Sequence, residues 1–368
     1  MRDPDELLYF IALTLVPQIG SVHSRILLEH YGNARAIFRS KTSLLEKIPG
    51  IGSVRAKNIC RFKDLKRAEK EIGFIEKYRI QPLLFFEDDY PQRLKQCADP
   101  PIILFHKGNT DLNAKKIVSI VGTRKQTEYG RMLVEQYLEA WGKLDILVVS
   151  GLAYGIDQIA HRNALKYGLS TVGVLANGLD IIYPSSHTSL AKEMILNGGL
   201  ITEFLSGTQP DKQNFPRRNR IVAGMCDAVL VVETDTKGGS MITADMAAGY
   251  NREVFAIPGR VHDRKSAGCN SLIRDSKARL SSDPDDIVEF MNWDLEKKVK
   301  QQFILPELNE DASSLYKLLQ AHGAIHIDQF YSRSGLKRSS FHTALLNLEL
   351  EGIVEQLPGK FYTLRIRT

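Results

Sequence analysis

A compact group of basic residues is the part of this sequence best suited to bind an anion. Four lysines and arginines fall within nine positions, in the segment Lys212-Gln-Asn-Phe-Pro-Arg217-Arg218-Asn219-Arg220. Guanidinium groups form paired hydrogen bonds with phosphate oxygens. Phe215 and Pro216, with the apolar helix expected over Ile221–Met225, would hold the arginines against a packed surface. Asn219 would orient a backbone group or a base edge. Charged runs are often only solvated surface, but this one predicts phosphate binding.

Three glycine-containing turns add further anion sites, because each follows an apolar stretch and precedes a helical one. Glycine lets a phosphate approach the free amides at a helix N-terminus. The turns are Gly122-Thr123-Arg124, then Ser150-Gly151 with Gly155, and then Gly238-Gly239-Ser240. Three turns and an arginine cluster exceed what one mononucleotide needs. We therefore expect a groove that holds several phosphates of a nucleic-acid strand.

Asp157 and His161 stand four positions apart and would share one face of a helix. This spacing suits a metal site or an acid–base pair, but such pairs more often cap and brace a loop. No third ligand is recognisable, so we interpret both residues as structural and expect no metal. The dinucleotide fingerprint GxGxxG is absent, which argues against a nicotinamide cofactor. No cofactor is expected.

Alternating strands and helices must position these residues. Residues 81–292 contain two short strands, at Leu83–Phe86 and Ile102–Phe105, and then six apolar runs separated by amphipathic helical segments. Continuous apolar strands with intervening helices predict a doubly wound parallel α/β sheet. In such a sheet, ligands bind beyond the carboxyl ends of the strands. The six runs are Ile117–Val121, Ile146–Val149, Thr171–Leu175, Leu200–Phe204, Ala228–Val232 and Val254–Ile257.

The first 80 residues contain a repeated pattern. Leu15-Val-Pro-Gln-Ile-Gly-Ser-Val22 recurs as Lys47-Ile-Pro-Gly-Ile-Gly-Ser-Val54. Each copy joins two apolar helical stretches, which predicts a pair of helix-hairpin-helix units in a small helical (SAM-like) domain. Its glycine turns would suit phosphate contacts, with Arg55 and Lys57 nearby. Equally, the hairpins would serve only for packing or for binding a protein.

The end of the chain reads as a separate unit. Residues 293–310 resemble a linker, and residues 311–368 suggest three helices, at Leu315–Leu319, Ile327–Ser332 and Phe341–Leu350, followed by a hairpin around Pro358-Gly359. Three helices and a terminal hairpin are typical of a winged helix. Because residues 301–368 are neutral overall, protein docking or regulation is at least as well supported as sequence-specific DNA binding.

Length and composition exclude several classes of protein. The chain has 368 residues, of which 43% are hydrophobic and 25% charged, as in globular proteins, so wholesale disorder is excluded. Apolar runs stay short of the roughly 18 residues that a membrane helix needs. The acidic N-terminus and four scattered cysteines indicate a cytoplasmic protein with reduced thiols. The net charge of +6 lies wholly in residues 1–80, where 15 basic residues face 9 acidic ones.

In combination, these motifs resemble the DprA/Smf family of bacterial DNA-processing proteins. The resemblance is specific over about residues 85–280, and the two flanking domains resemble those of the longer members. The motifs that carry it are Val121-Gly-Thr-Arg124, Ser150-Gly-Leu-Ala-Tyr-Gly-Ile-Asp157 with Ala160-His161, Tyr183-Pro184, Phe215-Pro-Arg-Arg-Asn-Arg220, Gly239-Ser-Met-Ile-Thr-Ala244 and Pro258-Gly259.

The resemblance implies an extended Rossmann-like core that binds and protects single-stranded DNA. It also implies a homodimer formed through that core, and the RecA recombinase as a partner loaded onto strands during natural transformation. By motif, Arg124, Arg218 and Arg220 would be the strand-binding arginines, and Gly122 and Gly151 would lie in the phosphate loops. The remaining members of the expected phosphate-binding set are Thr123, Ser150, Gly155, Lys212, Arg217, Asn219, Gly238, Gly239 and Ser240.

Two departures from the family pattern concern local geometry. Gly238 stands where the family usually has serine, and Ser276-Lys277 replaces a Gly-Ala pair after Leu272-Ile273.

We interpret the protein as a non-enzymatic mediator, and two other functions remain open. A phosphoribohydrolase-like enzyme would use a Gly-Gly-x-Gly-Thr-x-x-Glu turn, but the matching segment is Gly238-Gly-Ser-Met-Ile-Thr-Ala-Asp245. A nucleotide-sensing regulator would use the winged helix as its output.

Overall fold

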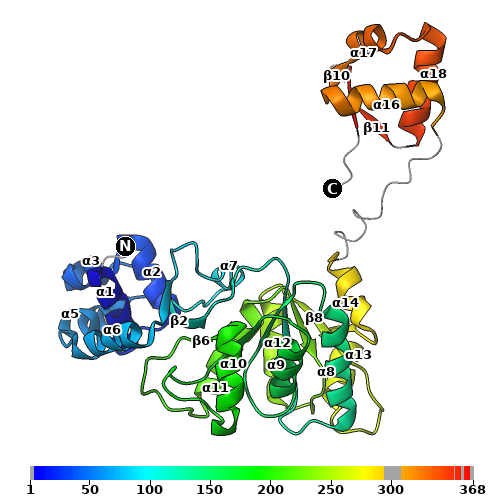
Figure 1. Ribbon diagram of the computed structural model, residues 1–368. Coiled ribbons are helices and arrows are strands. Elements are labelled where there is room, and N and C mark those ends of the chain that lie inside the picture. Colours follow the sequence, from blue (N-terminus) through cyan, green and yellow to red (C-terminus); the bar gives the residue numbers. More distant parts are fainter. Residues whose placement is uncertain (1–3, 294–307, 352, 358–359, 365–368) are drawn as a thin grey trace. The chain divides into compact units, whose positions relative to one another are not determined.

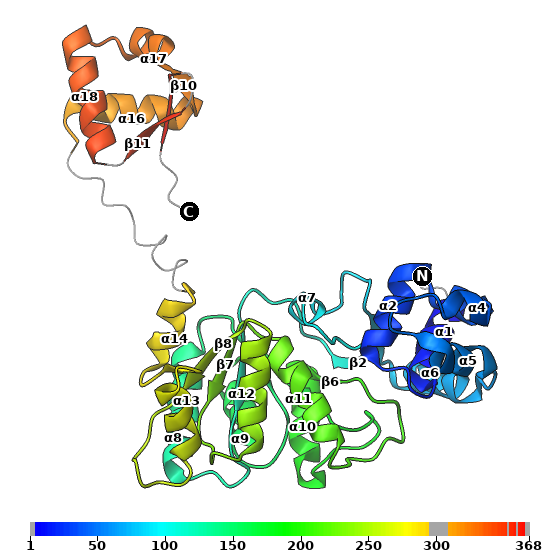
Figure 2. The ribbon, with the colours of Figure 1, turned by 180° about the vertical axis from the view of Figure 1, so that it is seen from behind.

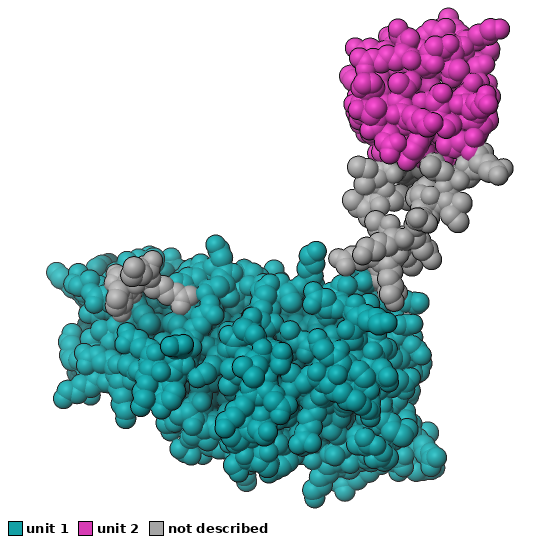
Figure 3. All heavy atoms as spheres, viewed as in Figure 1, with its two compact units in different colours: residues 1–293 teal, residues 294–368 magenta. Residues whose placement is uncertain are grey.

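The structure is a computed structural model that describes residues 4–293, 308–351, 353–357 and 360–364. It divides into two compact units, residues 1–293 and residues 294–368, which Figure 3 colours separately. Most of the expected linker, and the expected hairpin turn at Pro358-Gly359, lie outside the described residues. Within the described residues, no helix has the length and apolar character needed to cross a membrane.

The N-terminal region is helical, and its two repeated hairpin turns are tied together. Gln18 and Gly50 occupy the same position in the two copies, and both have left-handed backbone angles, with φ of 64° and 84°. Arg55 donates to the carbonyl oxygens of both residues, at 3.1 and 3.2 Å. This arginine therefore stabilises the helical pair. The helices are α1 (Pro4–Leu15), α2 (Ser21–Tyr31), α3 (Ala34–Arg39), α4 (Thr42–Leu45), α5 (Gly52–Arg61) and α6 (Lys66–Tyr78).

A nine-stranded sheet forms the centre of the first unit (Figure 1). Its spatial order is β1-β2-β6-β5-β4-β3-β7-β8-β9. The strands β1 and β2 run antiparallel to their neighbours. The remaining strands of this order, β6, β5, β4, β3, β7, β8 and β9, all pair in parallel. The predicted doubly wound sheet is thus confirmed. The strands are β1 (Gln81–Leu84), β2 (Ile103–Gly108), β3 (Ile117–Val121), β4 (Leu147–Ser150), β5 (Thr171–Val174), β6 (Gly198–Thr202), β7 (Ala228–Val231), β8 (Glu253–Ala256) and β9 (Arg279–Leu280).

Helices cover both faces of this sheet (Figures 1 and 2). Alternate residues of β3 point to opposite faces. Val118 and Ile120 pack with α8, α9 and α14, whereas Ile117 and Val121 pack in the core shared with α11, α12 and α13. The apolar character of both strand faces follows from this double burial. The helices of this part are α7 (Gln92–Lys95), α8 (Glu128–Trp141), α9 (Ile156–Lys166), the 3₁₀ helix η1 (Ser185–His187), α10 (Thr188–Leu196), α11 (Asn214–Gly224), α12 (Gly239–Gly249), α13 (Ala267–Arg274) and α14 (Pro284–Phe290).

Two helices begin earlier than the apolar pattern suggested. Helix α12 begins at Gly239, whereas the amphipathic pattern of the sequence becomes regular only from Thr243, and α11 begins at Asn214 rather than at the expected Ile221. Gly239 and Ser240 open α12, and Asn214, Pro216, Arg217 and Arg218 interrupt the apolar pattern at the start of α11, so a regular hydrophobic period starts only later. As a result, the three arginines of the basic cluster lie on α11 itself, and Lys212 lies just before it.

The second unit has the three helices and the hairpin strands of the predicted winged helix. Phe330 and Phe341 are fully buried at its centre, with ring centroids 5.4 Å apart. Its three strands pair in the order β10-β12-β11. The elements are α16 (Glu310–His322), β10 (Ile325–His326), α17 (Ile327–Ser334), α18 (Arg338–Leu350), β11 (Val354–Leu357) and β12 (Phe361–Leu364).

The departure at Ser276 has a measurable energetic consequence. Ser276 follows the end of α13 with φ of 55°, a left-handed angle that glycine adopts without strain. Its side chain is exposed. We expect Ser276→Gly to raise the free energy of unfolding by about 1 kcal/mol, because the strain of a Cβ at this angle is of that size. Urea unfolding measures this change, and an unchanged or lowered stability would contradict it.

Candidate nucleic-acid interface

A groove of about 490 Å³ lies where the strand order of the sheet reverses, between β3 and β7. Loops that follow adjacent parallel strands diverge at this point and leave a crevice for a ligand. We call this crevice the switch-point groove. Its lining includes ten of the residues expected to bind phosphate: Gly122, Thr123, Arg124, Gly151, Lys212, Arg218, Asn219, Gly238, Gly239 and Ser240.

Arg124 is the exposed guanidinium of this groove. Its guanidinium carbon lies 4.9 Å from the ring centroid of Phe215, and the aromatic face holds the side chain over the groove. Lys212, also exposed, lines the same groove from the start of the α11 segment. No ion pair involves either cation in the described part of the chain. Both charges are therefore available to an anionic ligand.

The loop that carries Arg124 is held by two residues that the sequence analysis did not single out. Glu233 accepts hydrogen bonds from the amide nitrogen of Thr127, at 2.9 Å, and from the Thr127 hydroxyl. Lys265 donates to Thr123 Oγ1 at 3.2 Å and to the Lys125 carbonyl oxygen at 2.5 Å. These contacts fix the loop from two sides. Because Glu233 and Lys265 are 106 to 142 positions away from the loop in the chain, the spacing of residues in the sequence gives no sign of these contacts.

The N-terminus of α12 supplies the opposite wall. Ser240 is only 6% exposed, yet its Oγ has no hydrogen-bond partner among the described residues. A buried hydroxyl without a partner is energetically costly. A Cβ added at Gly239 would meet no atom within 4 Å, so the backbone there borders open space. The first amides of α12, the hydroxyl and the positive end of the helix dipole together suit a phosphate.

Arg218 lies in the floor of the groove and is only 4% exposed. Its guanidinium donates to the carbonyl oxygens of Gly151 and Val174, which joins the ends of β4 and β5. A Cβ at Gly151 would overlap that guanidinium. Gly151 therefore borders the groove, and its lack of a side chain leaves the space that the Arg218 guanidinium occupies. Burial lowers the pKa of Arg218 to about 10, so it stays charged at neutral pH.

The structure does not bring the other two arginines of the cluster into the groove. Successive residues of a helix point about 100° apart. Arg220 accordingly lies on a different side of α11, where it pairs with Glu203 at 2.6 Å and donates to the Asp99 carbonyl oxygen. Arg217 is exposed and lies 5.0 Å above the Phe204 ring. Arg218 is thus a buried brace and Arg220 belongs to a buried ion pair, and the expected role of these two arginines in strand binding stays a prediction.

Ser150 and Gly155 also lie outside the groove lining. Ser150 is fully buried, and its hydroxyl donates to the Ile120 carbonyl oxygen at 2.6 Å. Gly155 has φ of 85°, and a Cβ there would overlap the Thr123 carbonyl oxygen. Both residues pack the loops together and do not border the groove.

Asp157 and His161 share a helix face but bind different partners. Asp157 Oδ2 accepts from the amides of Gly151 and Ala153, at 3.1 and 3.4 Å. His161 Nδ1 lies 2.7 Å from Thr171 Oγ1. Asp157 thus braces the loop after β4, whereas His161 links α9 to β5, and both contacts agree with a structural role.

Comparison with known proteins adds to this geometry. Residues 81–292 match the family model for DNA recombination-mediator protein A, and residues 301–360 match the DprA winged helix domain. The chain is 34% identical to protein Smf of Escherichia coli over 306 residues, 82% of each chain. The chain belongs to the DprA/Smf family.

Two solved structures of the DprA/Smf family resemble this fold. DNA processing protein A from Streptococcus pneumoniae superposes with a TM-score of 0.67 at 30% identity, covering 77% of this chain and 97% of that one. The Helicobacter pylori protein, described for its single-stranded DNA binding mode, has a TM-score of 0.53 at 29% identity, covering 59% and 97%. A role in DNA processing and recombination mediation follows from this membership.

In this DprA/Smf member, glycine replaces the usual serine at position 238, and the surrounding structure leaves no room for a side chain there. A Cβ at Gly238 would overlap Thr234 Oγ1. The groove wall of this protein is therefore packed for glycine at position 238.

Buried histidines make stability depend on pH. Burial, His187 and Arg218 lower the pKa of His161 from 6.5 to about 3. The unfolded chain therefore binds a proton below pH 6.5 that the folded chain excludes, and acid favours unfolding. We expect the contribution of His161 to the free energy of unfolding to fall by about 2 kcal/mol between pH 7 and pH 5.

His161→Asn isolates this contribution, because an amide can still bond Thr171 without titrating. Urea unfolding at pH 7 and pH 5 is expected to show a smaller loss of stability in the variant than in the unsubstituted protein. Equal losses in the two proteins would contradict the assignment.

Proposed function

We propose that this protein binds single-stranded DNA in the switch-point groove. The observation that carries the proposal is the convergence of Arg124 and Lys212 with Ser240, whose hydroxyl has no partner in the described part of the chain, at the N-terminus of α12. All of these groups are suited to phosphate oxygens. Phe215, beside Arg124, offers an aromatic face to a base. The name of the Helicobacter pylori relative, which refers to single-stranded DNA binding, supports the same assignment.

This arrangement fits strand binding of low sequence dependence. The cations and amides address the backbone, and stacking on an aromatic ring accepts every base. Affinity is then expected to fall steeply with salt as counterions are released.

We further propose that the strand-bound protein protects incoming DNA and loads the RecA recombinase during natural transformation. The basis of this proposal is the membership in the recombination-mediator family. Such a role places the protein in the cytoplasm, where RecA acts on DNA. Accelerated RecA filament formation on strands coated with this protein tests it, and unchanged kinetics would contradict it.

A homodimer through the Rossmann-like domain is part of the proposal. Strand β9 is an edge of the sheet, and Leu280 on it is 50% exposed. Open edges with apolar side chains favour association. Sedimentation equilibrium tests this point directly.

A nucleotide-processing activity has less support. The enzyme motif needs an acid after the Gly-Gly turn, and the residue in that position is Asp245. Its carboxylate is 55% exposed, pairs with Lys277 at 2.9 Å and does not line the groove. Asp245 is thus poorly placed to act on a ligand there, and we propose a non-enzymatic protein.

The experiment is a titration of the full chain with a fluorescent single strand of about 20 nucleotides, longer than one compact binding surface covers. A duplex of the same sequence serves as competitor. The proposal predicts that the single strand binds more tightly than the duplex. Equal or tighter duplex binding would contradict it.

A further inference from the structure

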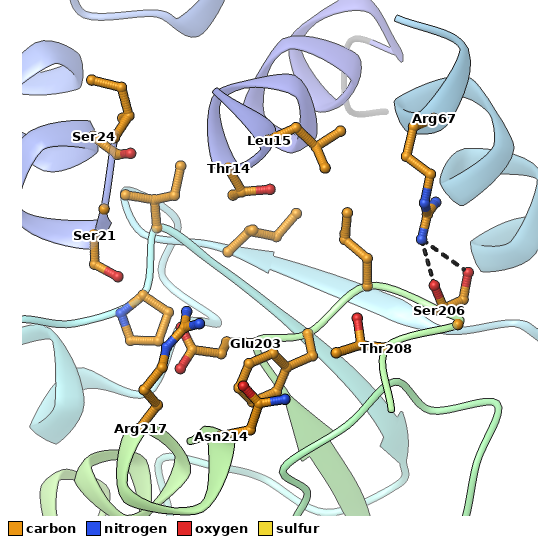
Figure 4. Close-up of a pocket in the computed structure, with 18 of the residues that line it drawn as sticks. Thr14, Leu15, Ser21, Ser24, Arg67, Glu203, Ser206, Thr208, Asn214 and Arg217 are labelled. Atoms are coloured by element: carbon orange, nitrogen blue, oxygen red, sulfur yellow. Dashed lines mark hydrogen bonds and ion pairs between the residues drawn. The ribbon is translucent and has the colours of Figure 1, made fainter. Parts of the chain in front are cut away.

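A second cavity, separate from the switch-point groove, lies on the other side of α11. Its volume is about 800 Å³, within the range of small-molecule sites. We call it the α6–α11 cavity, because α6 of the helical region and the start of α11 both border it. Figure 4 shows Glu203 and Arg217 on one side and Arg67 with Ser206 on the other. None of the functions proposed above uses this cavity.

Glu203 gives the cavity an unsatisfied hydrogen-bond acceptor. It follows β6 directly, and its side chain is only 6% exposed. Oε2 lies 2.6 Å from Arg220 and 3.6 Å from Arg217, whereas Oε1 has no hydrogen-bond partner among the described residues. A buried carboxylate oxygen without a donor is costly. The cavity therefore suits a ligand that donates an N–H or O–H to Glu203 Oε1.

The side chains that line the cavity indicate which chemical group the ligand carries besides this hydrogen-bond donor. Phe204 and Phe74 are among the apolar lining residues, and Arg217 lies over the Phe204 ring. Flat apolar surface next to a stacked guanidinium suits an aromatic ring.

Cations at the border suit an anionic group. Lys70 is exposed on α6 and forms no ion pair within the described residues. Arg67, by contrast, is committed to Glu71 at 2.8 Å and to the Ser206 carbonyl oxygen at 2.5 Å. Lys70 is thus the border cation without an ion pair among the described residues, and the exposed Arg217, which is paired only at 3.6 Å with Glu203, lies next to the same border.

We propose that the α6–α11 cavity binds a nucleoside phosphate whose base carries an amino group. The amino group donates to Glu203 Oε1, the base packs on Phe204, and the phosphate meets the border cations. A carboxylate accepts well from an exocyclic amine, as with cytosine N4. Uracil offers only an N–H flanked by two carbonyl oxygens, which Glu203 would repel. The proposal is independent of strand binding in the groove, because Arg124 and Lys212 do not line this cavity.

Calorimetric titration of the full chain with AMP, CMP and UMP tests the proposal. We expect saturable binding of AMP and CMP, with UMP at least about tenfold weaker because it lacks the exocyclic amine. Lys70→Ala is expected to weaken AMP about threefold to tenfold and to leave adenosine unchanged. Lys66→Ala, on the same helix and outside the cavity, is the matched control. Absence of saturable AMP and CMP binding would overturn the proposal.

A second variant avoids disturbing the buried pair of Glu203 and Arg220. Thr208 lines the cavity, and Thr208→Trp would fill it. Loss of AMP binding in this variant, with a retained circular dichroism spectrum, supports the site, and retained AMP binding would overturn it. Arg124→Ala is expected to leave AMP binding intact, which separates this site from the groove.

The nucleotide has two sources, a free metabolite or a base of a bound strand, and a competition experiment distinguishes them. If an oligonucleotide displaces AMP and loses affinity in Thr208→Trp, the cavity takes a base of the strand. If AMP and the oligonucleotide bind together, the cavity takes a free nucleotide. Either result supports the site.

Discussion

Replacing Arg124 with alanine is expected to weaken single-strand binding about tenfold, the worth of one charge-assisted phosphate contact. The slope of log affinity against log salt should lessen by about 0.7, which is the contribution of one phosphate on a single strand. Arg124 is exposed, and its cation–π contact with Phe215 holds it over the groove. The fold does not depend on it, so the thermal midpoint should stay unchanged.

Arg162→Ala is the matched control for this substitution. Arg162 is an exposed arginine on α9 and does not line the groove. Its removal lowers the net charge equally, so the control separates a local contact from a general electrostatic effect. Equal losses in the two variants, or no loss in Arg124→Ala, would place the strand elsewhere.

Gly239→Asp is expected to have the largest effect, a loss of strand affinity of about 100-fold or more. The substitution places a carboxylate at the first position of α12, where the structure has free amides. Two like charges about 4 Å apart repel by about 4 kcal/mol at an intermediate dielectric. The new carboxylate would also occupy the amides that a phosphate needs. Folding should be retained, because the Cβ position is open and an acidic residue favours a helix N-terminus.

Gly239→Asn separates charge from bulk. Asparagine has nearly the same shape as aspartate and no charge, so we expect this variant to lose less than about tenfold in affinity, the remaining cost of a neutral side chain among the amides. Fluorescence anisotropy on a labelled single strand measures both variants. Similar affinities for Gly239→Asp and Gly239→Asn would show that no phosphate lies at the N-terminus of α12.

The parallel sheet could be predicted from the sequence because its strands are buried on both faces. Continuous apolar runs such as Ile117–Val121 and Ala228–Val232 mark these strands within one residue of the observed bounds. The glycine turns after them indicated the groove, since parallel strands end at a common edge. The helix starts at Asn214 and Gly239 were missed, because glycine, proline and polar residues interrupt the apolar pattern there.

The directions and partners of the arginines in the basic cluster could not be predicted from the sequence. Proximity along the chain suggested that Arg218 and Arg220 act together, but helical geometry sends them in different directions. Their partners, the Gly151 carbonyl oxygen and Glu203, come from distant strands. Burial of these two guanidinium groups depends on tertiary packing, which spacing alone does not encode. Arg124, beside a glycine turn, was placed correctly at the groove because its position follows from the strand that precedes it.

Strand binding in the switch-point groove requires a phosphate at the N-terminus of α12, in the groove that Arg124 also lines. A crystal structure of the full chain with a short oligothymidylate tests this most directly. We expect a phosphate oxygen about 3 Å from Ser240 Oγ and the Gly239 amide, with the Arg124 guanidinium on the same strand. A strand bound elsewhere on the protein, with no phosphate between Ser240 and Arg124, would contradict it.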